Sequence, residues 1–258
     1  DSVWKLMSTK GADVNTFISV SDFYAGVMKE KMDIPEDKLS TVHIGVDPAD
    51  YTFRLATEKK RNIGYVSRMC YENGLDILVD AFILLKKKQE FEDVGLVLTG
   101  GSTGDDRKYL TEIRAKLKEH KLYDQVEFHE DFEEEGLRDY LDKVSMVSVP
   151  VRNGEAFGIY LLECMASGVP VVQPALGAFP EIVNSTEGGL IYEPNTPEAL
   201  AKSLESLLTD SKKLEDLSRK GAEGVDKHFH IDVQARNMVT IYENAIQSHA
   251  MAVETSKI

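Results

Sequence analysis

The sequence has little cysteine and no long apolar stretch. Its 258 residues include only two cysteines, Cys70 and Cys164, which lie far apart with no spacing typical of metal ligands. We therefore expect two separate buried thiols in a reducing compartment, the cytoplasm, rather than a disulfide. No run approaches the ~18–20 apolar residues of a membrane span, and no charged leader with an apolar core is found, so we expect no membrane contact through this segment.

Basic residues are also scarce. Lysine and arginine number 30 against 44 acidic residues, which gives a net charge of −14. This balance argues against a nucleic acid or an anionic membrane as a partner, because both attract positive surfaces. The sequence contains no Asp-x-Asp pair and no cluster of His and Cys, so it predicts metal-independent chemistry and no bound cofactor.

Strand-like and helix-like segments alternate about six times. This order predicts an α/β fold, a Rossmann-like parallel sheet with helices on both faces. The first residue is Asp, so we expect the chain to be part of a longer protein. The expected strands are 16–20, 41–44, 63–66, 95–99, 126–129, 145–151, 171–174 and 188–192. The expected helices are 22–32, 75–90, 107–121, 137–144, one between the glycines at 158 and 168, a short one near 180–183, helices from 197 to about 227, and 232–248.

The most informative stretch runs from Gly154 to Gly168. A buried strand precedes it, and Gly168 stands where a glycine commonly follows a helix C-terminus. The backbone N–H groups of residues 158–160 would have no partner inside the helix. Together with the helix dipole they form a favourable site for a diphosphate.

Two glutamates flank the start of this helix. Glu163 lies in its second turn, where an unpaired buried carboxylate is costly, and the 2′- and 3′-hydroxyls of a ribose would offer it two donors. Glu155 lies in the preceding turn and can reach a polar group beyond the phosphates. Their spacing alone is equally compatible with a solvated turn glutamate and a helix glutamate capped by a neighbour.

The surrounding residues favour the functional interpretation. Glu-Ala-Phe-Gly-Ile at 155–159, followed by Leu-Glu-Cys-Met-Ala-Ser-Gly-Val-Pro-Val-Val at 162–172, resembles the E-x7-E signature of family 4 (GT4) glycosyltransferases. The resemblance covers residues 16–242. It implies one half of a GT-B fold, the C-terminal, nucleotide-sugar donor-binding half of a retaining glycosyltransferase of polysaccharide or glycoconjugate biosynthesis.

The resemblance also implies a domain division and partners. Residues 16–230 would form the Rossmann-like donor-binding domain, and residues 1–15 would be the remnant of an interdomain segment. The C-terminal helix and tail, 231–258, would pack on an N-terminal acceptor-binding domain. The co-substrate would be a nucleotide sugar, with a UDP-sugar preferred over a GDP-sugar on family frequency, and the fragment alone would be inactive without the acceptor domain.

The candidate site residues follow the ends of four expected strands. They are Arg68, Gly100, His129 and Glu155. Because ligands of open parallel sheets bind at the carboxyl ends of the strands, topology alone predicts that these residues cluster. This prediction does not depend on the family resemblance.

The resemblance assigns a role to each candidate. Arg68 would hold the diphosphate and stabilise it as the leaving group, and Glu155 would contact the donor sugar and orient its anomeric carbon. Glu163 would hold the ribose. The other expected donor contacts are Phe157, Gly158, Ile159, Asn73, Gly100 and His129.

Two positions depart from the family pattern. Asn73 stands where the family usually has a lysine, so one cation near the diphosphate is lost, although the amide could donate a hydrogen bond. His129 or Glu130 stands where a glycine lining the base pocket is usual. Residues 177–183 resemble the family's GG-x-x-E-i-v segment near the sugar, and we expect His43 to be a strand residue rather than a catalytic one.

Two other functions remain open. One is a degenerate, non-catalytic glycosyltransferase-like module that binds a nucleotide or a partner, for which Asn73 is the best support. The other is a nucleotide-sugar epimerase of GT-B architecture, since a shared fold does not decide function.

Overall fold

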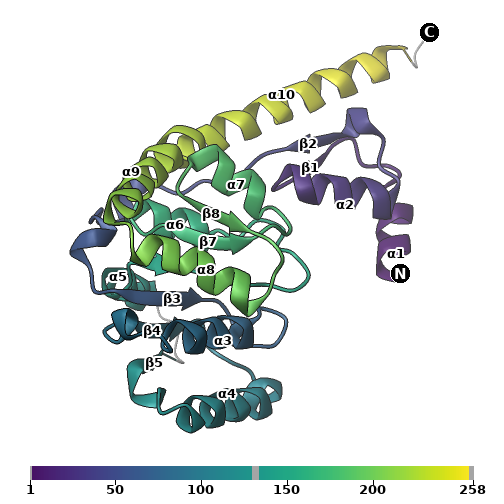
Figure 1. The fold of residues 1–258 in the computed structure, drawn as a ribbon. Coiled ribbons are helices and arrows are strands. Elements are labelled where there is room, and N and C mark those ends of the chain that lie inside the picture. The colour runs from purple at the N-terminus through teal and green to yellow at the C-terminus, as the bar shows by residue number, and fades with distance from the viewer. Residues whose placement is uncertain (1, 130–133, 256–258) are drawn as a thin grey trace.

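The main body of the protein is a six-stranded parallel sheet (Figure 1). The structure is a computed structural model that describes residues 2–129 and 134–255. The strand order is β5-β4-β3-β6-β7-β8 and every neighbouring pair is parallel. The strands are β3 (Asn62–Val66), β4 (Gly95–Thr99), β5 (Val126–His129), β6 (Met146–Val147), β7 (Val171–Pro174) and β8 (Gly189–Tyr192).

The strand order of the sheet changes direction between β3 and β6. From β3 the chain proceeds outward to β4 and β5, then returns to place β6 on the other side of β3. A crevice forms at such a switch point beyond the carboxyl ends of the strands. The loops that follow β3 and β6 therefore border the place where a ligand is expected.

Helices cover both faces of the sheet (Figure 1). Helix α3 packs on α8 and helix α6 packs on α9. The parallel sheet with helices on both faces confirms the expected fold class. The helices of this body are α3 (Leu75–Leu85), α4 (Arg107–Glu119), α5 (Glu134–Lys143), α6 (Tyr160–Ala166), α7 (Phe179–Thr186), α8 (Pro197–Leu208) and α9 (Ser211–His228). The prediction that the first of them continues to Glu90 was wrong, because α3 ends at Leu85 and a separate 3-10 turn, Gln89–Phe91, precedes β4.

The first two strands do not join the large sheet. Strand β1 (Phe17–Ser19) pairs in parallel with β2 (Leu39–Thr41), and helix α2 (Asp22–Met32) connects them. The predicted strand at 41–44 was therefore misplaced, since pairing ends at Thr41 and His43 lies beyond the strand. We call β1, α2 and β2 the small unit; the boundary expected at residue 16 stays a prediction.

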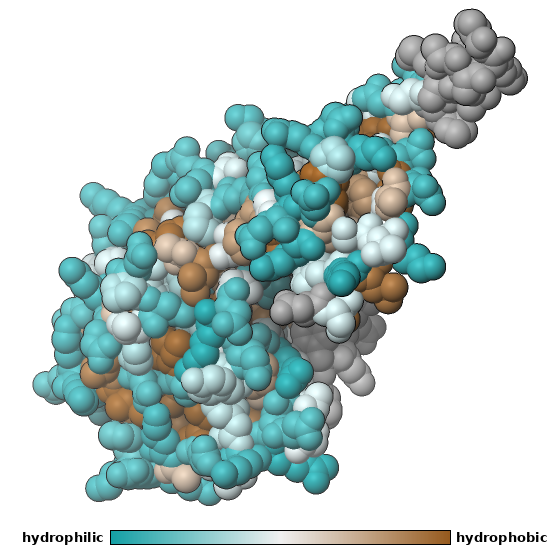
Figure 2. Space-filling model, turned by 90° about the vertical axis from the view of Figure 1, so that its right-hand side faces the viewer, coloured by the Kyte–Doolittle hydropathy of each residue, from teal (hydrophilic) through white to brown (hydrophobic). Residues whose placement is uncertain are grey.

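Two helices at the ends of the chain carry exposed apolar side chains. Helix α1 (Ser2–Gly11) was not predicted, and α10 (Ile231–Thr255) is longer than expected. Large apolar side chains that are 44–69% exposed are Val3, Leu6 and Met7 on α1 and Val239, Tyr242 and Ile246 on α10. Figure 2 shows a surface that is mostly hydrophilic, with further apolar areas on the main body. In the described part of the chain no helix is long and apolar enough to cross a membrane.

The chain enters and leaves the six-stranded body at one place. The Val46 N–H donates to the Phe229 carbonyl and the Ile231 N–H donates to the Val46 carbonyl, both at 2.9 Å. The backbone of Gly45 lies so close to Ile231 that a Cβ at Gly45 would be 2.8 Å from its Cα. The two connections therefore run in contact.

Candidate functional site

The loops after β3 and β6 touch across the switch point. Gly74, at the end of the first loop, has φ +70°, and a Cβ there would lie 2.0 Å from the Pro150 carbonyl oxygen in the second loop. Only glycine fits this contact, because any side chain would collide with backbone. The two loops are thereby held together at the crevice.

Arg68 lies in the first loop, where the sequence placed it, but it has an internal partner. Its Nε and Nη2 each donate to the Asp106 carboxylate at 3.1 Å, while half of the Arg68 side chain remains exposed. The Arg68 guanidinium lowers the pKa of Asp106 to about 2, and the Asp106 carboxylate raises the pKa of Arg68. The Thr103 N–H and hydroxyl also donate to Asp106, each at 2.7 Å. Part of the positive charge of Arg68 is thus balanced within the chain.

Asn73, in the position of the missing lysine, donates hydrogen bonds within its own loop. Its amide nitrogen donates to the Ser67 hydroxyl at 2.8 Å and to the Arg68 carbonyl at 3.2 Å. An amide has two N–H donors, and both are used inside the loop. In this structure Asn73 shapes the loop that carries Arg68, and the expectation that it also contacts the diphosphate stays a prediction.

Gly100 and His129 lie at the carboxyl ends of β4 and β5. Gly100 has φ +124°, and a Cβ there would lie 2.2 Å from the Ser67 carbonyl oxygen, so the loop after β4 rests on the loop after β3. His129 pairs in register with Thr99, beside Gly100, and its Nε2 is 3.4 Å from a carboxylate oxygen of Glu127. The loops after β3, β4 and β5 therefore lie side by side at this edge of the sheet, and the expected grouping of Glu155 with them stays a prediction. Glu130 and the acidic residues to Glu133 lie outside the described residues.

The loop from Gly154 to Gly158 leads into α6. Both glycines have positive φ, +81° and +86°. The Phe157 ring is buried, so any donor contact of this residue must come from its backbone, whereas Ile159 is 43% exposed. Among the described residues, no acceptor is found for the N–H groups of residues 158–160.

The two glutamates of the predicted motif are both half-buried. Glu155 accepts a hydrogen bond from the Ala156 N–H at 3.2 Å through its carboxylate. Glu163 accepts one from the Tyr51 hydroxyl at 3.2 Å. Burial and the neighbouring Glu163 carboxylate raise the pKa of Tyr51, which keeps the hydroxyl as a donor. The roles expected of both glutamates remain predictions.

One arginine of the crevice was missed in the sequence. Arg152 follows β6 and forms an ion pair with Asp76 at 2.6 Å, and its guanidinium lies 3.7 Å from the centre of the Tyr71 ring. It also donates to the Tyr71 carbonyl, so it joins the loops after β3 and β6 a second time. An arginine near the end of a strand, the signal that identified Arg68, was available here too.

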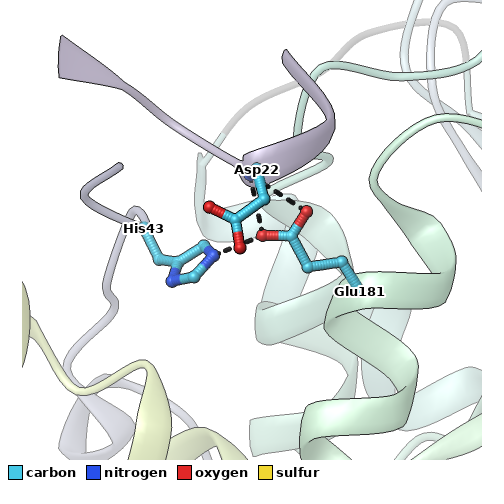
Figure 3. Close-up of side chains that lie close together, drawn as sticks. All are labelled: Asp22, His43 and Glu181. Carbon is cyan, nitrogen blue, oxygen red and sulfur yellow. Dashed lines mark hydrogen bonds and ion pairs between the residues drawn. The ribbon is translucent and has the colours of Figure 1, made fainter. Parts of the chain in front are cut away.

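A second missed cluster joins the small unit to α7. Glu181, in the first turn of α7, faces Asp22 at the start of α2 and His43 beyond β2 (Figure 3). Atoms of these three side chains that could bind a metal lie within 4.8 Å of one another. The contacts are hydrogen bonds, however: His43 Nε2 and Glu181 Oε1 are 2.5 Å apart, closer than the roughly 3.3 Å that two tetrahedral ligands with bonds of about 2 Å require.

Comparison with known proteins identifies the family. A family model described as glycosyl transferases group 1 matches residues 50–224. The chain belongs to this family. The matched range of this group 1 glycosyltransferase chain contains Arg68, Glu155 and Glu163, whereas Asp22 and His43 lie before it.

Relatives of this group 1 glycosyltransferase chain are longer than the chain itself. The lipopolysaccharide core biosynthesis mannosyltransferase LpsB of Rhizobium meliloti is 28% identical over 225 residues, which are 86% of this chain and 60% of that protein. A D-inositol 3-phosphate glycosyltransferase of Xylanimonas cellulosilytica is 29% identical over 224 residues, 81% of this chain and 52% of that protein. The chain thus spans about half to three fifths of the curated relatives it matches.

A solved structure shares the fold of this group 1 glycosyltransferase chain. HepE of Anabaena, in complex with UDP, superposes with a TM-score of 0.85 at 16% identity, over 94% of this chain and 68% of that one. At this identity the likeness concerns the fold alone. It agrees with the six-stranded parallel sheet flanked by helices and with its place as one half of a GT-B fold.

Proposed function

We propose that this chain is the donor-binding part of a retaining, GT4-type hexosyltransferase that acts in polysaccharide or glycoconjugate biosynthesis. The donor is a nucleotide-diphosphate sugar, with a UDP-sugar preferred over a GDP-sugar, and no metal or further cofactor takes part. The observation that carries the proposal is the position of Glu155 and Glu163: they flank the start of α6 at the switch point, within the range matched by the family. The mannosyltransferase relative and the UDP complex of HepE support the substrate class.

The geometry supports a division of labour along the donor. The Glu163 carboxylate, held by the Tyr51 hydroxyl, is set to receive ribose hydroxyls. The half-exposed Arg68 and the N–H groups of residues 158–160 stabilise the departing diphosphate, because preorganised donors are most effective where charge develops. Glu155 contacts the sugar and orients its anomeric carbon.

The acceptor side comes from a domain outside this chain. Exposed apolar side chains on α1 and α10 would be covered by that domain, since apolar surface of this kind favours contact with protein. We propose that residues 231–255 pack on it, and that this chain alone binds the donor without transferring the sugar.

A binding module without activity is the second candidate. Two observations favour it: Asn73 stands in the lysine position with both amide donors used inside the loop, and Asp106 balances part of the Arg68 charge. Both weaken the stabilisation of a leaving diphosphate without removing the ribose contact. The two candidates therefore differ in transfer and agree in nucleotide binding.

Calorimetric titration of this chain with UDP, GDP and ADP tests the shared part. We expect one nucleotide to bind with a Kd of about a micromolar. Glu163→Ala should weaken this binding at least about tenfold, the equivalent of one good hydrogen-bonded contact. Glu223→Ala, at an exposed position on α9, is the matched control and should leave the affinity unchanged. Absence of binding to all three nucleotides would contradict the proposal.

Activity of the full-length protein separates the two candidates. We expect Glu155→Gln to reduce sugar transfer far more than it reduces the free energy of unfolding, because the residue acts on the sugar rather than on the fold. Transfer by that variant at the wild-type rate would remove Glu155 from the proposed mechanism. Nucleotide binding without any transfer by the wild type would favour the inactive module.

A further inference from the structure

The backbone of the Glu155 loop is held at two successive carbonyl groups. The Ala178 N–H, just before α7, donates to the Glu155 carbonyl at 3.0 Å. The Ser21 hydroxyl, just before α2, donates to the Ala156 carbonyl at 2.6 Å, across 135 positions of sequence. The loop that carries the proposed sugar contact is thus fixed from the body on one side and from the small unit on the other.

The next residue of the loop is held by ring packing. The Phe157 ring lies 6.2 Å from the His43 ring and 6.1 Å from the Phe229 ring, measured between centres. His43 and Phe229 themselves meet edge to face at 5.4 Å. Because the Phe157 side chain is buried among these rings, the loop cannot move without disturbing the connections at both ends of the body.

Glu181 fixes the partners of the loop relative to each other. Its carboxylate accepts hydrogen bonds from the N–H groups of Asp22 and Phe23, at 2.9–3.2 Å, and contacts His43 at 2.5 Å (Figure 3). These N–H groups begin α2, where a carboxylate is favoured by unsatisfied donors and the helix dipole. Glu181 therefore ties the start of α2 to the first turn of α7, the helix whose preceding residue holds the Glu155 carbonyl.

We propose that Ser21 and Glu181 are positioning residues for Glu155. They fix the backbone of residues 155 and 156, and so the direction of the Glu155 carboxylate, without touching the donor. This inference rests on the proposed function. It implies that the sugar contact requires the small unit to be bound to the body through Ser21 and Glu181. Nucleotide binding depends less on this attachment, because Glu163 is held separately by Tyr51, although the N–H groups of residues 158–160 follow the same loop.

Because Glu163 is assigned to the ribose and Glu155 to the sugar, the test compares the affinities for a nucleotide and for its nucleotide sugar. UDP reports the proposed ribose and diphosphate contacts, at Glu163, Arg68 and the N–H groups of residues 158–160, and a nucleotide sugar adds the contact at Glu155. The ratio of the two affinities isolates the sugar contribution. A general loss of structure would reduce both affinities together, whereas a positioning defect reduces the ratio.

The variants at Ser21 separate its two hydrogen bonds. Ser21 is also the N-cap of α2, since its Oγ accepts from the Tyr24 N–H. Thr keeps both bonds, Asp keeps the cap but when ionised cannot donate to the Ala156 carbonyl, and Ala loses both. Glu181→Ala removes the second tie. Ser203→Ala, which removes a hydroxyl-to-carbonyl bond inside α8, is the matched control.

Calorimetry and amide hydrogen exchange on the whole chain provide two independent measurements. The nucleotide sugar is the one of UDP-glucose, UDP-galactose, UDP-N-acetylglucosamine and GDP-mannose that binds wild type most tightly. We expect Ser21→Asp, Ser21→Ala and Glu181→Ala to reduce the affinity ratio about tenfold with a smaller change in the nucleotide affinity, and to speed exchange in residues 154–157 about fivefold. Ser21→Thr and Ser203→Ala should match wild type in both measurements.

The outcomes distinguish this inference from the proposed function. If wild type binds nucleotide and nucleotide sugar but the variants change neither ratio nor exchange, the positioning role is refuted and the proposed function stands. If Glu155→Gln leaves the ratio of wild type unchanged, Glu155 makes no sugar contact and the positioning role is refuted. If wild type binds no nucleotide at all, both proposals fail, whatever the exchange shows.

Discussion

Replacement of Gly100 by alanine should destabilise the protein strongly, because two independent constraints act at this position. The residue has φ +124°, a conformation that L side chains rarely adopt and that costs about 1–3 kcal/mol. The added Cβ would lie 2.2 Å from the Ser67 carbonyl oxygen, and overpacking of this kind costs a further 1–3 kcal/mol or so. We expect a loss of about 2–6 kcal/mol, a large part of the roughly 5–15 kcal/mol that stabilises a typical domain.

Gly104 provides the control, since it follows in the same loop. A Cβ at Gly104 meets nothing within 4 Å, so Gly104→Ala should change the free energy of unfolding by less than about 0.5 kcal/mol. Urea unfolding followed by far-UV circular dichroism measures both variants on one scale. A loss below about 1 kcal/mol for Gly100→Ala, or equal losses for the two variants, would refute the argument that the loop after β4 rests on Ser67.

Three further predictions concern charge. Asn73→Lys should bind UDP about tenfold more tightly than Asn73→Met, which loses the same two hydrogen bonds without adding a charge. Equal affinities of the two variants in calorimetry would contradict a diphosphate near this loop. The pKa of Asp106 is lowered to about 2, so its pairing with Arg68 stabilises the fold fully above the ordinary pKa of 3.8, and this contribution is lost as pH falls through about 2. In urea titrations the stability advantage of wild type over Asp106→Asn should therefore shrink from pH 5 to pH 2. Burial lowers the pKa of Lys59 from 10.5 to about 8, so between these pH values the unfolded chain binds more protons than the folded one and stability rises with pH. From pH 8 to 10 the free energy of unfolding of wild type should increase relative to that of Lys59→Met by up to roughly 1.4 kcal/mol per pH unit, and parallel pH profiles would exclude the buried ammonium.

The sheet and the edge that carries the site could be predicted because their signals are local. Each strand of the large sheet is a short apolar run bounded by turn residues, as at 95–99, and the alternation with helices defines a parallel sheet. The position of Arg68, Gly100 and Glu155 at one edge follows from that topology alone. The bounds of β2 failed because 41–44 is as strand-like as 39–41, and only the partner strand β1 decides the register.

The contacts that adjust the site carry no local signal. Arg68 pairs with a residue 38 positions away, Glu163 with one 112 positions away, and Ser21 with one 135 positions away. A serine before a helix predicts an N-cap, which Ser21 is, but gives no indication that its hydroxyl also donates to Ala156. Helix α1 was missed for a different reason: none of its residues is buried, so no apolar face was paired with a core to produce a period.

The contact of the two connections at Val46 and Ile231 restricts how the six-stranded body can move. Twisting one connection past the other would break the hydrogen bonds between them, whereas bending both together would leave these bonds intact. Bending at this contact would also have to break the bonds from Glu181 and Ala156 to the small unit and His43. The same contact brings the two ends of residues 47–229 close together. Segments with adjacent ends are the ones that can be inserted into another protein as a domain.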